Sequence, residues 1–90
     1  MITCFYKKTF LKDLARLPLP QRKQIEKLIF EQIPQLDSIF TTPNVKKMKG
    51  YQNYYRIRLG DYRIGFEVKE AKNVIFYRVK SRSDIYKLFP

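Results

Sequence analysis

The 90-residue sequence contains no histidine or tryptophan, one cysteine and three scattered glycines. Without histidine, the chain cannot build a Ser-His-Asp triad, a Cys-His nucleophile pair or a histidine-based metal site. Cys4 has no second cysteine with which to form a disulfide, which favours a reducing compartment. The glycines are too dispersed to form a phosphate-binding loop. The sequence therefore predicts no metal site and no bound cofactor.

Acidic residues are also scarce, with 8 Asp and Glu against 19 Lys and Arg, for a net charge of +11. They are dispersed among the lysines and arginines of the sequence, so a catalytic pair of carboxylates is not expected. An excess of positive charge this large in so short a chain indicates a polyanionic or acidic partner. Nucleic acid, an anionic membrane surface and an acidic protein all remain open on charge alone.

Long hydrophobic runs are missing as well. No apolar segment approaches the roughly 20 residues that a membrane-spanning helix needs. The N-terminal apolar stretch meets Lys7 and Lys8 at once, so we expect no signal peptide, no membrane association and a cytoplasmic location. Residues 1–90 are expected to form a single domain.

The spacing of apolar residues predicts an α+β fold with the element order β-α-α-β-β-β-α. The expected elements are a strand over 2–6, a helix over 8–17, a second helix that opens at Pro18-Leu19-Pro20 and ends or kinks at Pro34, a hairpin over about 53–69, a strand over 74–80 and a short helix that starts at Ser81-Arg82-Ser83-Asp84. The basic segment over 45–50 has room for one further short strand. The simplest arrangement is a mostly antiparallel sheet with the two N-terminal helices on one face. The opposite face would then stay open.

The hairpin is the most informative segment. Gly60-Asp61 suits a two-residue turn with glycine at its first central position, which places Arg58 opposite Arg63. Because strand side chains alternate between faces, one face of the hairpin becomes wholly apolar. That face carries Tyr55, Ile57, Leu59, Tyr62, Ile64 and Phe66.

The other face of the hairpin is basic. It carries Arg56, Arg58 and Arg63 around Gly65. Like charges placed opposite each other destabilise a sheet, whereas guanidinium groups bind phosphate oxygens through two hydrogen bonds. Glycine would allow close approach of a ligand. This face is therefore either a phosphate-binding site or a solvated outer surface.

Other basic residues could extend this surface. Lys80 and Arg82 would join it if the last strand pairs with the hairpin, whereas Arg78 is interpreted as a charge at the rim. A short basic run forms either a solvated loop or a nonspecific phosphate contact; it consists of Lys46, Lys47 and Lys49.

Tyr86 lies in the expected terminal helix and has two readings. It either packs against the sheet or places its phenol near the arginines. Nearby positive charge favours the ionised form of a phenol, which could then act as a general base or as a stacking platform.

Three motifs carry a resemblance that covers essentially the whole chain. They are Tyr-Arg-Ile-Arg-Leu at 55–59, Asp-Tyr-Arg-Ile at 61–64 and Val-Lys-Ser-Arg-Ser-Asp-Ile-Tyr at 79–86. With the element order, they resemble the RelE/ParE superfamily of toxins from bacterial and archaeal toxin–antitoxin pairs. The resemblance implies a cytoplasmic toxin that a cognate antitoxin neutralises by wrapping around it.

RelE-like members of this superfamily cleave mRNA in the ribosomal A site, whereas ParE-like members poison DNA gyrase. Matched to the RelE pattern, the catalytic residues would be Arg56, Arg58, Arg63, Arg82 and Tyr86, with Lys80 beside them. Ser81 stands where many relatives carry histidine. Because arginine stays protonated, it is a poor proton donor and cannot accept a proton, so Tyr86 is the candidate base.

The sequence therefore predicts a ribosome-dependent, metal-independent endoribonuclease toxin. Its expected partners are an antitoxin and mRNA on the ribosome. Lys46, Lys47, Lys49 and Lys80 are expected to bind RNA. Two alternatives remain, namely a ParE-like gyrase-binding toxin and a noncatalytic basic protein that binds RNA or antitoxin.

Overall fold

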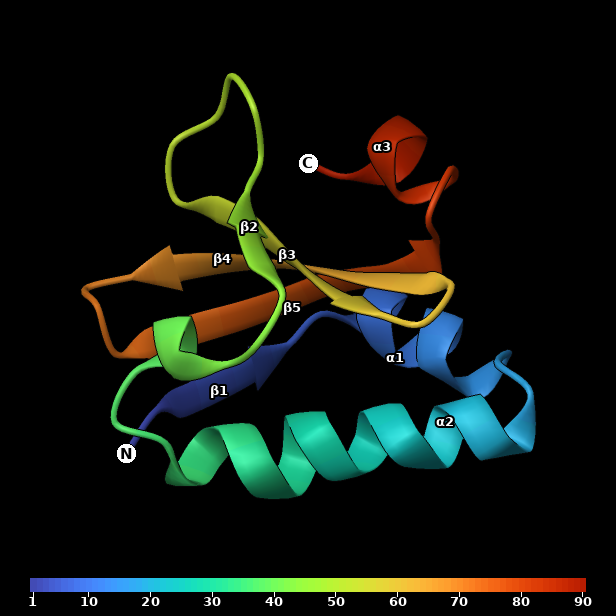
Figure 1. Cartoon of the computed structure of the whole chain (residues 1–90), viewed down its shortest axis with the longest axis horizontal. Coiled ribbons are helices and arrows are strands. Elements are labelled where there is room, and N and C mark those ends of the chain that lie inside the picture. The colour runs from blue at the N-terminus through green and yellow to red at the C-terminus, as the bar shows by residue number, and fades with distance from the viewer.

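A computed structural model describes all 90 residues as one five-stranded sheet with three α-helices (Figure 1). The elements are β1 (Thr3–Tyr6), α1 (Lys8–Ala15), α2 (Leu19–Glu26), β2 (Val45–Lys47), β3 (Tyr54–Leu59), β4 (Tyr62–Lys69), β5 (Asn73–Ser81) and α3 (Ile85–Leu88). The strand order is β1-β5-β4-β3-β2, and only β1 and β5 are parallel. The predicted α+β class and mostly antiparallel sheet are confirmed, and the observed order adds one short strand, β2, to the predicted order.

The second helix is longer than α2 alone. It continues as a π-helical turn over Lys27–Gln32 and ends in a 3₁₀ turn over Ile33–Gln35. Pro34 lies in that last turn, where its missing N–H prevents the helix from continuing. The prediction that Pro34 ends this helix is confirmed.

The main core lies between the sheet and the first two helices, which cover the same face (Figure 1). Apolar side chains of both helices supply one side of it, and the predicted apolar face of the hairpin supplies the other. Its fully buried members include Phe10, Ile25, Ile29, Ile33, Ile57, Ile64, Phe66 and Phe76. No helix is long and apolar enough to cross a membrane.

The register of the hairpin is the predicted one. Arg58 pairs with Arg63, Arg56 pairs with Gly65, and Gly60 adopts a φ of 60° at the turn. That value lies in the left-handed region, where glycine carries no steric penalty. The three arginines therefore share the face of the sheet that lies away from α1 and α2.

This second face is not fully open, and that prediction is wrong. The C-terminal segment crosses it (Figure 1), and Met48, Ile85 and Phe89 form a small second core there with Tyr54 and Tyr77. A Cβ atom on Gly65 would lie 2.6 Å from Cδ2 of Phe89. The missing side chain at Gly65 therefore admits a phenyl ring, and not the phosphate group that the sequence suggested.

Candidate nucleic-acid interface

A basic cleft of about 460 Å³ lies on the second face of the sheet. The loop of residues 48–53 between β2 and β3 rises on this side, as do α3 and the C-terminus (Figure 1). The charged residues that line the cleft are Lys46, Lys47, Lys49, Arg56 and Lys87. No acidic side chain lines it. The cleft therefore presents concentrated positive charge to an anionic ligand.

Two of these cations come from adjacent strands in register. Lys46 of β2 pairs with Arg56 of β3, so both side chains project from the same face. Nη1 of Arg56 donates a hydrogen bond to the carbonyl oxygen of Asn44 at 3.2 Å. That bond orients the guanidinium group of Arg56, which lines the cleft.

Tyr86 also lines the cleft and is 56% exposed. The burial of Ile85 and Phe89 in the second core holds α3 against the sheet. Before this helix, Oγ of Ser81 accepts a hydrogen bond from the N–H of Asp84 at 3.3 Å, which closes the turn that leads into α3. The structure thus brings Tyr86 into the same cleft as Arg56, although 30 residues separate them in the sequence.

The remaining predicted arginines lie outside the cleft lining and gather near the hairpin turn. Nη1 of Arg63 donates to the carbonyl oxygens of Gly60 at 3.0 Å and Tyr62 at 3.1 Å. The backbone N–H of Arg82 donates to the carbonyl oxygen of Asp61 at 2.9 Å, which holds exposed Arg82 beside the same turn. The turn therefore carries a second basic group, separate from the cleft.

Arg58 connects these two groups. It is exposed, it pairs in register with Arg63, and its Nη2 donates to Oδ1 of Asn44 at 3.3 Å. Asn44 thus contacts both Arg56 and Arg58. The basic residues form a continuous line along the hairpin, from the cleft to the turn.

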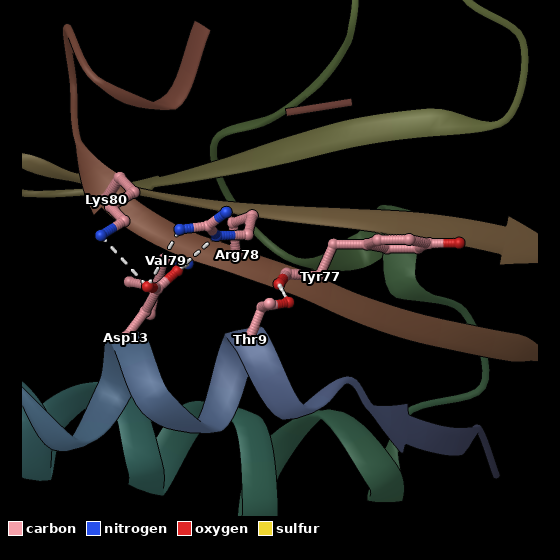
Figure 2. A network of polar contacts seen from close by, with 6 residues as sticks. All are labelled: Thr9, Asp13, Tyr77, Arg78, Val79 and Lys80. Carbon is pink, nitrogen blue, oxygen red and sulfur yellow. Dashed lines mark hydrogen bonds and ion pairs between the residues drawn. The ribbon is translucent and has the colours of Figure 1, made fainter. Parts of the chain in front are cut away.

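Lys80 and Arg78 have a partner that the sequence reading missed (Figure 2). Nζ of Lys80 lies 3.1 Å from Oδ1 of Asp13, and Nε of Arg78 lies 2.7 Å from Oδ2 of the same carboxylate. The interpretation of Arg78 as a rim charge is therefore wrong. Lys80 does lie opposite Arg63 in register, but its ammonium group is held by Asp13 at the edge of the sheet.

Asp13 is buried on α1 and also accepts the backbone N–H of Val79 at 3.2 Å. Burial of the carboxyl raises its pKa, but the hydrogen bonds from Arg78, Lys80 and Val79 outweigh that effect and hold the pKa below its ordinary value. The sequence did contain a signal that Asp13 has a buried partner. Asp13 lies three residues after Phe10 and four before Leu17, on the apolar stripe of the helix, where a carboxylate requires a buried partner.

A second tyrosine also lies on this face. The hydroxyl of Tyr77 donates to Oε1 of buried Glu67 at 2.7 Å. Burial and the neighbouring carboxylate raise the pKa of Tyr77 well above its ordinary value. Tyr77 therefore stays neutral and supports the second core through its contact with Phe89, and unlike Tyr86 it does not line the cleft.

Comparison with known proteins gives one consistent assignment. Residues 5–86 match the family model described as the ParE toxin of the type II toxin–antitoxin system parDE. The chain is 49% identical over 86 residues to Toxin RelE3 of Methanocaldococcus jannaschii, covering 94% of this chain and 96% of that protein.

Solved structures agree with this assignment. The RelB-RelE antitoxin–toxin complex from Methanococcus jannaschii contains a chain that is 48% identical, with a TM-score of 0.79 and coverage of 96% of this chain and 99% of that one. The isolated E. coli RelE toxin is 23% identical and shares the fold, with a TM-score of 0.66 and coverage of 97% and 93%. The family match spans every residue of the predicted site.

Proposed function

Because the chain belongs to the RelE/ParE family of toxins from type II toxin–antitoxin systems, we propose that it arrests translation by cleaving mRNA on the ribosome. It would act as a metal-independent endoribonuclease in the cytoplasm, where translated mRNA is found. The observation that carries the proposal is the meeting of Arg56 and Tyr86 in one basic cleft that no acidic side chain lines.

The proposed reaction uses the RNA itself as nucleophile. A ribose 2′-OH attacks the adjacent phosphorus atom, the ionised phenol of Tyr86 accepts the hydroxyl proton, and the bond to the 5′ oxygen breaks. The 5′ oxygen leaves with the electron pair of that bond and takes a proton from water, so the products are a 2′,3′-cyclic phosphate and a 5′ hydroxyl. Arg56 and Lys46 stabilise the charge that develops on the phosphate oxygens.

The arginines outside the cleft would hold the neighbouring part of the strand. Arg58, Arg63 and Arg82 continue the line of positive charge from the cleft to the hairpin turn. Arg63 would exchange its bonds to the Gly60 and Tyr62 carbonyls for bonds to a phosphate. Lys47 and Lys49, which line the cleft, would add phosphate contacts. Lys80 would do so only while its ammonium group stays paired with Asp13.

We also propose a protein partner. The structure of the relative from Methanococcus jannaschii is that of an antitoxin–toxin complex with RelB. A cognate antitoxin of this type would bind the present chain and suppress its activity. A net charge of +11 favours an antitoxin with acidic segments.

A translation-coupled cleavage assay tests the activity. We expect the wild-type protein to cut a translated mRNA, Tyr86→Phe to lower the rate about 10²- to 10⁴-fold through loss of the base, and Arg56→Ala and Arg63→Ala to lower it through loss of phosphate stabilisation. Lys23→Ala, on exposed helix α2, is the control and should cleave at the wild-type rate. Wild-type rates in the first three variants would reject the site, and an inactive wild type would reject the activity.

The family description also names ParE toxins, which favours a second candidate function. In this alternative the toxin binds DNA gyrase and has no catalytic residues. Inhibition of gyrase supercoiling, together with intact mRNA in the translation assay, would establish it. RNA binding without cleavage and without gyrase inhibition would instead indicate a noncatalytic basic protein.

A further inference from the structure

A second exposed aromatic side chain lines the same cleft as Tyr86. Tyr51 belongs to the loop of residues 48–53 and is 50% exposed, and Tyr86 is 56% exposed. The remaining exposed side chains of the lining are mostly cations. Exposed aromatic rings beside a line of lysines and arginines are typical of surfaces that bind single-stranded nucleic acid.

The ring of Tyr51 is held in place by its neighbours. It packs edge-on against Tyr54 at a centroid distance of 6.2 Å, and Tyr54 in turn packs against Phe89 at 5.6 Å. The backbone N–H of Tyr51 donates to the carbonyl oxygen of Met48 at 3.3 Å, and Gly50 adopts a φ of 84°, which allows the tight loop. Tyr51 therefore presents a ring face whose position is already set before any ligand binds.

We propose that Tyr51 is a stacking platform for a nucleobase of single-stranded RNA. The base would stack on the Tyr51 ring while Lys46 and Lys49 hold the adjoining phosphates. Stacking of this kind needs an unpaired, accessible base and accepts all four bases, so the site selects single strands and not a particular sequence. The inference rests on the proposed RNA substrate, and it assigns to Tyr51 a binding role that is separate from catalysis.

Binding of a short single-stranded RNA tests the proposal. A fluorescently labelled 2′-O-methyl oligonucleotide of about ten residues matches the usual length of such sites and cannot be cleaved, because its nucleophilic hydroxyl is blocked. We expect Tyr51→Ala to weaken binding about 5- to 150-fold, the range for loss of one base stack. Tyr51→Phe keeps the ring and should retain wild-type affinity.

The chain offers a matched control in Phe40. Phe40 is also 50% exposed and packs edge-on against a tyrosine, Tyr55, at 5.0 Å, but it does not line the cleft. Phe40→Ala should bind with wild-type affinity. Wild-type affinity in Tyr51→Ala, or an equal loss in Phe40→Ala, would overturn the proposal.

A second probe compares two oligonucleotides on each protein. An abasic oligonucleotide with the same phosphates should bind wild type more weakly than the base-bearing one, and Tyr51→Ala should reduce that preference. An equal preference in both proteins would also overturn the proposal.

The cleavage assay separates this result from the proposed activity, because a wild type that binds through Tyr51 without cutting rejects the activity alone. A wild type that cuts while Tyr51→Ala binds normally rejects the stacking role alone.

Discussion

The carboxylate of Asp13 accepts two hydrogen bonds from the guanidinium group of Arg78, from Nε at 2.7 Å and from Nη2 at 3.2 Å (Figure 2). The same carboxylate accepts the N–H of Val79, and one helical turn earlier Oγ1 of Thr9 donates to the carbonyl oxygen of Tyr77 at 3.0 Å. Strand β1 pairs with β5 only as far as Phe76. Helix α1 therefore supplies the hydrogen-bond partners that the free edge of β5 would otherwise lack.

We expect Asp13→Asn to destabilise the protein by about 2–4 kcal/mol, because it leaves Arg78 and Lys80 without a counter-charge. The cost is below that of a fully buried pair, since both cations keep some contact with water. Urea unfolding measures the change. Asp37→Asn is the control, because the Asp37 side chain is fully exposed, and its unfolding curve should match that of the wild type. Equal curves for wild type and Asp13→Asn would show that the network adds no stability.

The stabilisation by Asp13 should depend on pH. Its pKa in the folded protein lies below the ordinary value of 3.8, so unfolding raises the pKa and takes up a proton in acid. The contribution is complete well above pH 3.8 and is lost as the pH falls through 3.8 and then through the lower folded-state pKa. The difference in unfolding free energy between wild type and Asp13→Asn should therefore be constant from neutral pH to about pH 5 and shrink below it. A difference that stays constant or grows in acid would contradict this account.

The hairpin could be predicted from the sequence because its determinants are local. The alternation of apolar and basic residues decides which face each side chain occupies, and Gly60 sets the turn that fixes the register. A shift of one residue would place Ile57 and Ile64 in solvent and the arginines in the core. A shifted register would be much less stable than the observed one. The pairing of Arg58 with Arg63 therefore followed from the alternation of apolar and basic residues.

The contacts made by distant segments could not be predicted in this way. Asp13 meets Arg78 across 65 positions of sequence, and Phe89 covers Gly65 only because the C-terminal segment crosses the sheet. Helical and strand periodicities say nothing about such crossings. Strand periodicity also fails to predict a contact at short range. The guanidinium group of Arg63 donates hydrogen bonds to carbonyl oxygens of the adjacent hairpin turn. The basic face could thus be predicted from the sequence. The structure shows that its residues form three groups: those that line the cleft, those near the hairpin turn, and the cations paired with Asp13 at the edge of the sheet.

Gly65→Ala tests how the C-terminal segment is seated. The new methyl group would lie 2.6 Å from the Phe89 ring, so the ring must move, and we expect a loss of about 1–3 kcal/mol in urea unfolding. In a Phe89→Ala background the methyl group has room, and the same substitution should cost much less. This coupling between the two positions is the diagnostic result. An equal cost in both backgrounds would place the strain elsewhere in β4.

The salt dependence of RNA binding should distinguish a direct phosphate contact in the cleft from nonspecific attraction by the net charge of the protein. If Lys46 touches a phosphate in the cleft, Lys46→Gln should lower the slope of log K against log salt concentration by about 0.7, the value for one contact with a single strand. Lys23→Gln removes the same charge from exposed α2, on the other side of the sheet, and should leave the slope unchanged (Figure 1). Titration of the 2′-O-methyl oligonucleotide at several salt concentrations measures both slopes. Equal reductions in the two variants would mean that the net charge of +11 attracts RNA without a defined cleft contact.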